Sequence, residues 1–392
     1  MTSREKALLA VVSVCHGLIH AYMLVFPTIY NTLKQVLDLK FAAVGFVGMA
    51  SYLAFGFGAL PSGFLADRLG ASRMLLICLA GTSAASVVGV VSGSMLGAVI
   101  ALVLVGLFAS MYHPAGLALL STSINQNDLG RALGIHGMAG TVGVAVAPLI
   151  AGSMTARFGW TSAYLVLGLA GLIVLVGFVR FAPGGSRHLT GEHEGGRQGR
   201  GRFSRQLLLI YLISAVYGLI YRGVMTFFPS YLAERVSFIG DNVGRLGAVS
   251  SGILVISMIG PLLGGYLASG RRLIERNLLV VFIVLAALMA GFYFSEEGLL
   301  IVLAIPTVLL IFGFQPLQNT LIARSSHTGQ RGAVYGINYT VGFGIGATAS
   351  GIGGVIGQTY GLRSVFLLAF GLCLVEIVLV GIALAQRRYS GG

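Results

Sequence analysis

The sequence has few charged residues. Asp, Glu, Lys and Arg make up 9% of the 392 residues, whereas about a quarter of the residues of a soluble globular domain are charged. Hydrophobic residues make up 56% of the chain, and its mean hydropathy is +0.91. This composition excludes an ordinary soluble domain and indicates a membrane protein.

Cysteine and catalytic motifs are also scarce. The three cysteines, Cys15, Cys78 and Cys373, lie far apart inside apolar segments, a pattern that predicts neither a disulfide framework nor a zinc knuckle. No nucleophile–base pair and no metal-hydrolase motif stands out along the chain. We therefore expect no enzyme activity, no cofactor and no resident metal.

Long apolar segments recur along almost the whole chain. A hydrocarbon core about 30 Å thick needs a helix of about 20 apolar residues. The first segment is of membrane length and is not followed by a signal-peptide cleavage site, so we expect it to remain in the protein. Twelve spans are expected, at 7–29, 43–66, 74–92, 96–122, 132–155, 160–182, 206–231, 243–268, 277–295, 298–322, 331–355 and 362–386.

Basic residues predict how these helices are oriented. If both termini lie on one side, 18 of the 25 Lys and Arg residues fall on that side and six on the other. Because loops rich in Lys and Arg stay in the cytoplasm, we expect a multi-pass protein of the inner membrane with both termini cytoplasmic. This bias explains the net charge of +13 without a nucleic-acid partner, with contact to membrane lipid as a secondary effect.

The chain contains an internal repeat. Pro114 and Gly140 return as Pro316 and Gly342, an offset of 202 residues that several other positions share. The repeat predicts an all-α membrane protein with two six-helix bundles arranged as parallel repeats and a substrate site between them.

A polar segment separates the two copies of the repeat. Residues 183–205 are basic and Gly-rich and have no helical periodicity, which is typical of a flexible linker. We therefore expect an N-terminal bundle at 1–182, a cytoplasmic linker at 183–205 and a C-terminal bundle at 206–392.

A short charged motif joins the second and third spans. It includes Gly63, Asp67, Arg68, Gly70 and Arg73. We expect Gly63 to allow close helix approach, Asp67 to lie against a helix N-terminus, and the arginines to anchor the cytoplasmic face. The run resembles the loop 2–3 signature of the major facilitator superfamily, Gly-x-Leu-Ala-Asp-Arg-x-Gly, and the resemblance implies a secondary transporter that works by alternating access.

The fifth span carries a spaced set of small residues. Gly134, Gly143, Pro148 and Gly152 follow a spacing that resembles the superfamily's helix 5 antiporter motif, with two glycines replaced by alanine. The proline predicts a bend, and the glycines predict a surface for close helix contact. Gly-rich membrane helices also reach this spacing by chance, but the resemblance favours export over import.

Histidines take the place of intramembrane carboxylates. Of the twelve Asp and Glu residues only Glu376 lies deep in a span, on the twelfth helix, which is peripheral in the superfamily. His16, His20, His113 and His136 lie inside spans, where an ionisable residue is a candidate functional group. Imidazole titrates in the range that a proton-driven carrier needs. The alternative is that each histidine only forms hydrogen bonds between helices.

Arg222 in the seventh span is the candidate substrate-binding group. A guanidinium suits a carboxylate, phosphate or phosphonate, and the expected cavity helices offer no carboxylate to pair with it. The alternative is an arginine satisfied by an aromatic ring or by carbonyl groups. Five neutral donors are expected opposite the histidines: Tyr217, Tyr221, Gln315, Gln318 and Asn338.

A narrower resemblance involves the first and fourth spans. His16-x-x-x-His20 and Tyr112-His113-Pro114 resemble the fosmidomycin-resistance-type branch of the superfamily, whose members carry His-x-x-x-Asp and Phe-His-Pro at these places. His20 replaces that aspartate, so the coupling scheme of the branch does not transfer directly.

These observations favour a monomeric, proton-coupled antiporter that exports a small anionic or amphiphilic compound. His16, His20 and His113 would share proton and substrate binding, and Arg222 would bind the anion. One alternative is proton-coupled uptake of an organic anion by the same residues; another is a membrane sensor that has lost flux. A third is transport of a transition metal by intramembrane ligands chosen from Cys15, His16, His20, Met23, His113 and His136.

Overall fold

The computed structural model describes residues 1–91, 95–181, 205–268, 274–325 and 331–390, and this part of the chain is helical without strands. The first set of helices is α1 (Ser3–Val36), α2 (Phe41–Leu69), α3 (Ala71–Val91), α4 (Met95–Ala109), α5 (Tyr112–Ser123), α6 (Gln126–Phe158) and α7 (Thr161–Phe181). The second set is α8 (Arg205–Arg235), α9 (Val243–Ser257), α10 (Ile259–Ala268), α11 (Ile274–Phe294), α12 (Glu297–Ser325), α13 (Arg331–Tyr339), a π-helical segment (Thr340–Ile345), α14 (Gly346–Tyr360) and α15 (Arg363–Ser390).

Twelve helical segments of the described chain are long and apolar enough to cross a membrane. This confirms the expected fold class and the number of spans. Most ends lie within a few residues of those predicted, but α1 continues to Val36, beyond the expected end at residue 29. The longer helix brings Tyr30 to the first residue of α2, where the Tyr30 hydroxyl donates to the carbonyl of Phe41 at 2.6 Å.

Two spans that the sequence predicts as continuous are interrupted. The fourth consists of α4 and α5, with a break two residues before His113, and the eighth consists of α9 and α10, with a break at Met258. A proline ring clashes with the carbonyl four residues earlier in a helix and has no N–H to donate. Pro114 and Pro261 therefore account for the two breaks.

Helix α6 packs closely against α1 and α9, as its glycines predict. A Cβ on Gly143 would lie 1.9 Å from the carbonyl oxygen of Gly17 in α1, and one on Gly152 would lie 2.4 Å from that of Val243 in α9. At the bend, the backbone N–H of Leu149, next to Pro148, donates to the Ser251 hydroxyl at 2.9 Å. Small residues thus form the close helix contacts along this helix.

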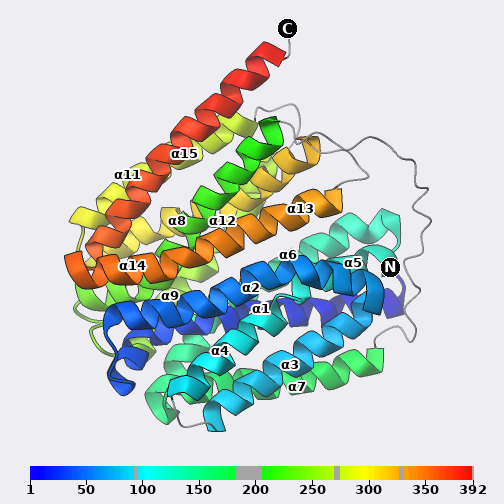
Figure 1. Cartoon of the computed structure of the whole chain (residues 1–392), viewed down its shortest axis with the longest axis horizontal. Helices are drawn as coiled ribbons and strands as arrows, with labels where there is room; N and C mark the ends of the chain where they lie inside the picture. The colour runs from blue at the N-terminus through cyan, green and yellow to red at the C-terminus, as the bar shows by residue number, and fades with distance from the viewer. Residues whose placement is uncertain (92–94, 182–204, 269–273, 326–330, 391–392) are drawn as a thin grey trace.

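The helices run side by side across the molecule, and the chain ends lie toward one face of the bundle (Figure 1). We call this the termini face, because α1 and α8 begin there and α7 and α15 end there. The two sets of helices meet along α6 and α9 and along α2 and α14. In both contacts, the helices touch near the ends that lie away from the termini face. Gly152 lies against Gly247, and Gly45 lies against Gly354.

A pocket of about 540 Å³ lies on the face opposite the termini, between the two sets of helices. Its charged lining comes from Lys34, Lys40, Glu234 and Asp241.

The loop motif forms the connection between α2 and α3. Gly70 has a φ of 87°, a conformation that only glycine adopts readily, so it makes the turn. A Cβ on Gly63 would meet nothing within 4 Å, so the close approach predicted there is not found. Arg68 and Arg73 are exposed on the termini face, while the side chain of Asp67 lies outside the described residues.

The division into bundles at 1–182 and 206–392 stays a prediction, and residues 183–204 of the linker lie outside the described residues. One pair of turns nevertheless follows the repeat. Gly159 and Gly361, which are 202 residues apart, have φ values of 83° and 84°.

Candidate functional site

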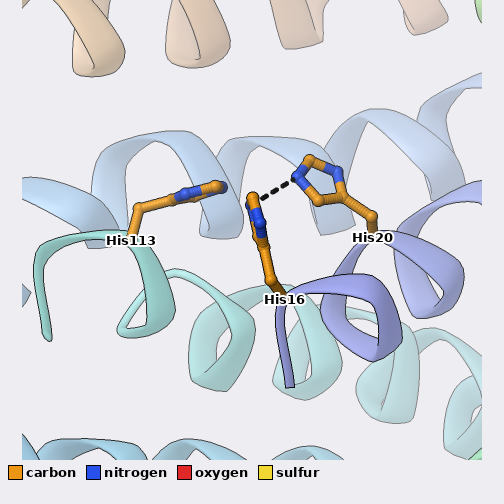
Figure 2. A group of neighbouring side chains, drawn as sticks. All are labelled: His16, His20 and His113. Atoms are coloured by element: carbon orange, nitrogen blue, oxygen red, sulfur yellow. Dashed lines mark hydrogen bonds between the residues drawn. The ribbon is translucent and has the colours of Figure 1, made fainter. Parts of the chain in front are cut away.

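Three histidines gather in the middle of the helical bundle. His16 and His20 project from one face of α1, because residues four apart share a helix face, and His113 projects from the first turn of α5. Their rings point toward one another (Figure 2). The ring centroid of His16 lies 4.8 Å from that of His20 and 5.3 Å from that of His113. We call these three residues the histidine triad.

His136 on α6 packs against His16 of the triad. Its ring stacks on His16 with centroids 4.2 Å apart, and its backbone carbonyl lies 2.8 Å from Nδ1 of His16. Tyr112 lies nearly parallel to His16 at 5.3 Å and donates its hydroxyl to the carbonyl of Val12. His16 and His136 are buried, with 8% and 2% of their surfaces exposed, whereas His20 and His113 are partly exposed.

The hydrogen bonds determine which nitrogen atoms of the pair carry protons. A carbonyl oxygen only accepts, so Nδ1 of His16 carries the hydrogen in its bond to His136. Nε2 of a neutral His16 is therefore an acceptor, and Nε2 of His20, 3.1 Å away, donates to it. Adding a proton to His16 at Nε2 would break this bond unless His20 changed tautomer. A proton added at Nδ1 of His20 would leave the bond intact, so His20 is the member of the pair that can take up a proton.

His113 links the triad to the second set of helices. Its ring is nearly parallel to that of Tyr339, with centroids 6.0 Å apart, and lies 6.4 Å from that of Phe343. Nε2 of His113 is buried without a hydrogen-bond partner among the described residues. A buried polar atom in this condition requires an explanation, and an absent ligand supplies one.

The triad is also a possible metal-binding group. One ring nitrogen from each of His16, His20 and His113 lies within 4.8 Å of the other two. Cys15, which the sequence suggests as a further metal ligand, does not belong to this group and is buried in the protein core.

Arg222 is buried in α8, with 5% of its surface exposed. The guanidinium carbon lies 3.6 Å from the centroid of the Tyr52 ring and 5.6 Å from that of Tyr221. This cation–π contact is worth about 2 kcal/mol when desolvated. Nη1 finds no hydrogen-bond partner among the described residues, so the aromatic ring only partly satisfies the arginine.

Two of the expected neutral donors, Gln318 and Asn338, form a separate group with Ser214. Asn338 accepts from Ser214 and from Nε2 of Gln318, the latter at 3.2 Å, and Gln318 also donates to Ser214. These three residues are buried. We call them the amide cluster, and its hydrogen bonds join α8, α12 and α13.

The remaining neutral donors lie apart from the amide cluster. Tyr217 donates to the carbonyl of Ile311 at 2.5 Å and stacks on Phe314. Tyr221 lies beside Arg222, and Gln315 is exposed. Gln315 and Tyr221 are therefore the neutral residues with polar groups that the described contacts leave available.

Sequence reasoning missed Tyr52 and Ser214 as members of this region. Each is an isolated polar or aromatic residue within an apolar span, and such residues pack in membrane helices without a recognisable pattern. The offset of 202 residues assigns Asn338 to the position of His136, but nothing in the sequence places Tyr52 under Arg222.

The chain is similar to known transporters. A family model described as Major Facilitator Superfamily matches residues 10–350. The multidrug resistance protein MdtG of Escherichia coli O9:H4 (strain HS) is 24% identical over 382 residues, covering 94% of this chain and 92% of that protein. The probable L-galactonate transporter of Escherichia coli (strain K12) is 26% identical over 147 residues, covering 38% of this chain and 32% of that protein. The chain thus matches about a third of this second relative's length.

A solved structure has the same arrangement of helices. It is the crystal structure of a bacterial homolog to the human lysosomal transporter Spinster, in an inward-facing and occupied conformation. The TM-score is 0.78 with 13% sequence identity, and the match covers 98% of this chain and 97% of that chain. The likeness shows the fold.

Proposed function

The chain belongs to the Major Facilitator Superfamily, and from this membership we propose that it is a proton-coupled antiporter that exports a small anionic or amphiphilic compound. The family and fold are those of multi-pass membrane transporters. The proposal places the protein in the inner membrane as a monomer with both termini in the cytoplasm. Its partners are the substrate, protons and membrane lipid.

Arg222 is the observation that carries the proposal. A cation in the middle of a membrane protein costs roughly 2.5–3.5 kcal/mol on insertion scales, so it needs a compensating partner. Tyr52 supplies part of the compensation, and Arg222 has no ion-pair partner among the described residues. A transported anion would complete the set of partners around the guanidinium, as a carboxylate or phosphonate matches its planar donors.

The histidine triad supplies the coupling in this proposal. His16 and His20 share a hydrogen bond between their Nε2 atoms, and imidazole takes up and releases protons near neutral pH. A substrate anion at Arg222 and a proton on the triad would influence each other, because charges interact strongly in an interior of low dielectric constant. Such mutual influence is the energetic requirement for coupled transport.

Export is supported by two observations. The close packing of α6 at Gly143 and Gly152 agrees with the antiporter-like spacing of that helix, and MdtG, which is similar over most of the chain, is a multidrug resistance protein. The contacts of Gly152 with Gly247 and of Gly45 with Gly354 join the two sets of helices toward the face opposite the termini.

Proton-coupled uptake of an organic anion is the second candidate. An anion at Arg222 would favour a proton on His20, so the two would bind together and cross together. The probable L-galactonate transporter is a relative whose name specifies an organic anion. This candidate uses the same residues and differs only in the direction of substrate flux relative to protons.

Transport in sealed vesicles tests the proposal. We expect Arg222→Gln to abolish flux of an anionic substrate while leaving membrane insertion and the thermal transition intact, and Arg222→Lys to retain part of the flux because it keeps the charge. Full transport by Arg222→Gln would contradict the anion site. With an imposed pH gradient, substrate movement against the proton flow supports antiport, and movement with it supports uptake.

A further inference from the structure

We propose that the histidine triad is a binding site for one divalent transition-metal ion of the Zn²⁺, Ni²⁺ and Co²⁺ class. The metal would be part of the transported substrate. The inference deepens the proposed function and rests on it only for this last statement, since the site itself follows from the positions of His16, His20 and His113.

The geometry of the triad approaches that of a metal site. Zinc binds histidine nitrogen at about 2.0–2.1 Å, so two nitrogen atoms on a tetrahedral ion are about 3.3 Å apart by the same bond length. Nε2 of His16 and Nε2 of His20 are 3.1 Å apart. The three ligand atoms all lie within 4.8 Å of one another, so the nitrogen of His113 must approach the other two for all three to bind one ion.

Hydrogen bonds outside the triad prepare it to bind a metal. A metal-binding histidine usually donates its other ring N–H to a carbonyl or carboxylate, which fixes the tautomer and orients the ring. His16 donates Nδ1–H to the carbonyl of His136 and so presents an unprotonated Nε2 to the other two histidines. Nε2 of His113, buried without a partner among the described residues, gains one when a metal binds.

Metal binding at the triad would explain how antiport arises. Histidine must be neutral to bind a metal, so a metal ion competes with the protons of a protonated triad for the same nitrogen atoms. In the neutral pair, the hydrogen on Nε2 of His20 would move to Nδ1 of the same ring, which frees Nε2 for the metal. Substrate and protons then compete for one site, as exchange requires.

Arg222 determines which form of the metal the site favours. A guanidinium near His20 repels a free divalent cation, but it attracts the carboxylate or phosphonate groups of an organic molecule that carries the metal. Three protein ligands leave at least one coordination position open for donor atoms of that molecule. The shared chemistry is therefore a transition-metal ion, delivered free or within an anionic chelate.

Binding of Co²⁺ tests the site directly. Full-length protein in nanodiscs, purified without a histidine tag and with His188, His193 and His327 replaced by alanine to remove the histidines outside the triad and α6, is titrated with CoCl₂. We expect one equivalent to bind and to give the intense visible absorption of cobalt in a low-coordinate nitrogen site. Absence of saturable binding, or absorption typical of hexahydrated cobalt, would overturn the proposal.

Substitutions assign the binding to the triad. His113→Gln is the most informative change, because Nε2 of His113 has no hydrogen bond to lose; we expect at least a tenfold loss of Co²⁺ affinity. Cys15→Ala is the matched control, since it removes another potential metal ligand of α1 that does not belong to the triad. Equal affinity of His113→Gln and the parent protein, with both folded by circular dichroism, would contradict the assignment.

A second measurement distinguishes the free ion from the chelate. Ni²⁺ alone is compared with Ni²⁺–citrate, an anionic complex in which citrate occupies three coordination positions and leaves three open. If the chelate is the ligand, Arg222→Gln weakens binding of the complex and leaves binding of Ni²⁺ unchanged or stronger. Equal binding of the complex by both proteins supports the free ion instead. Failure of the transport proposal at Arg222 would leave the Co²⁺ result standing, so the two proposals fail separately.

Discussion

The histidine triad and the amide cluster occupy related places in the two halves of the repeat but differ in chemistry. His16 and His20 correspond to Tyr217 and Tyr221, and His136 corresponds to Asn338. The triad leaves Nε2 of His113 without a partner among the described residues, whereas the amide cluster satisfies Asn338 within its own set of helices. The comparison teaches that one repeat retains groups that change charge while the other forms fixed neutral contacts.

This difference assigns separate tasks to the two halves of the chain in the proposed mechanism. Protons, and a metal ion if it binds, would be exchanged at the first half through imidazole. The second half would supply a fixed positive charge at Arg222 and a rigid support. Tyr52 connects the two halves, because it lies on α2 and its ring packs against Arg222 on α8.

The largest effect is expected when the triad is converted to its counterpart in the second repeat. His20→Tyr places the residue of position 221 at position 20 and removes the imidazole that donates to His16. We expect loss of proton-driven flux with facilitated exchange of substrate retained. Substrate-induced pH changes in vesicles measure the coupling, and an unchanged response would break the comparison.

The next largest effect is expected in the close contact behind the triad. Gly143→Val would place side-chain atoms against the backbone of Gly17, where even a Cβ would lie at 1.9 Å, and we expect a loss of about 3 kcal/mol or more, since backbone cannot move aside easily. Thermal unfolding in detergent measures it. Gly137→Ala on the same helix is the control, because a Cβ there meets nothing within 4 Å.

A smaller effect is expected at the contact between the halves. Tyr52→Leu removes the ring beneath Arg222 and should lower stability by about 1–2 kcal/mol, the range of a desolvated cation–π contact. Tyr52→Phe keeps the ring and should lose little. Thermal midpoints of the three proteins test this, and equal losses for Leu and Phe would show that the hydroxyl, which donates to Met23, matters more than the ring.

The smallest effect is expected in the amide cluster. Ser214→Ala removes one member of the group that joins Gln318 and Asn338, which should cost about 1 kcal/mol of stability for a lost hydrogen bond. The pH dependence of transport should not change, because no group in the cluster titrates. A shifted pH profile in this variant would show that the two halves do not divide the tasks as proposed.

Part of the site could be predicted from the sequence. The spacing of His16 and His20 places them on one helix face, and the depth of Arg222 in its span places it in the membrane. The contacts of His113 with His16 and His20, and of Arg222 with Tyr52, could not be predicted. Each contact joins helices whose relative rotation is determined by packing. The helix break before His113 follows from Pro114, a local signal that the long apolar run conceals.

The sequence by itself determined the membrane class, the twelve spans, the repeat and the family, because hydropathy, loop charge and short motifs are local properties of the chain. Only the tertiary structure decided which polar groups meet. Three imidazoles converge because α5, which begins at the break in the fourth span, packs against α1. Arg222 lacks an ionic partner among the described residues because helix packing places it against the rings of Tyr52 and Tyr221, and such an environment depends on the arrangement of distant segments in space.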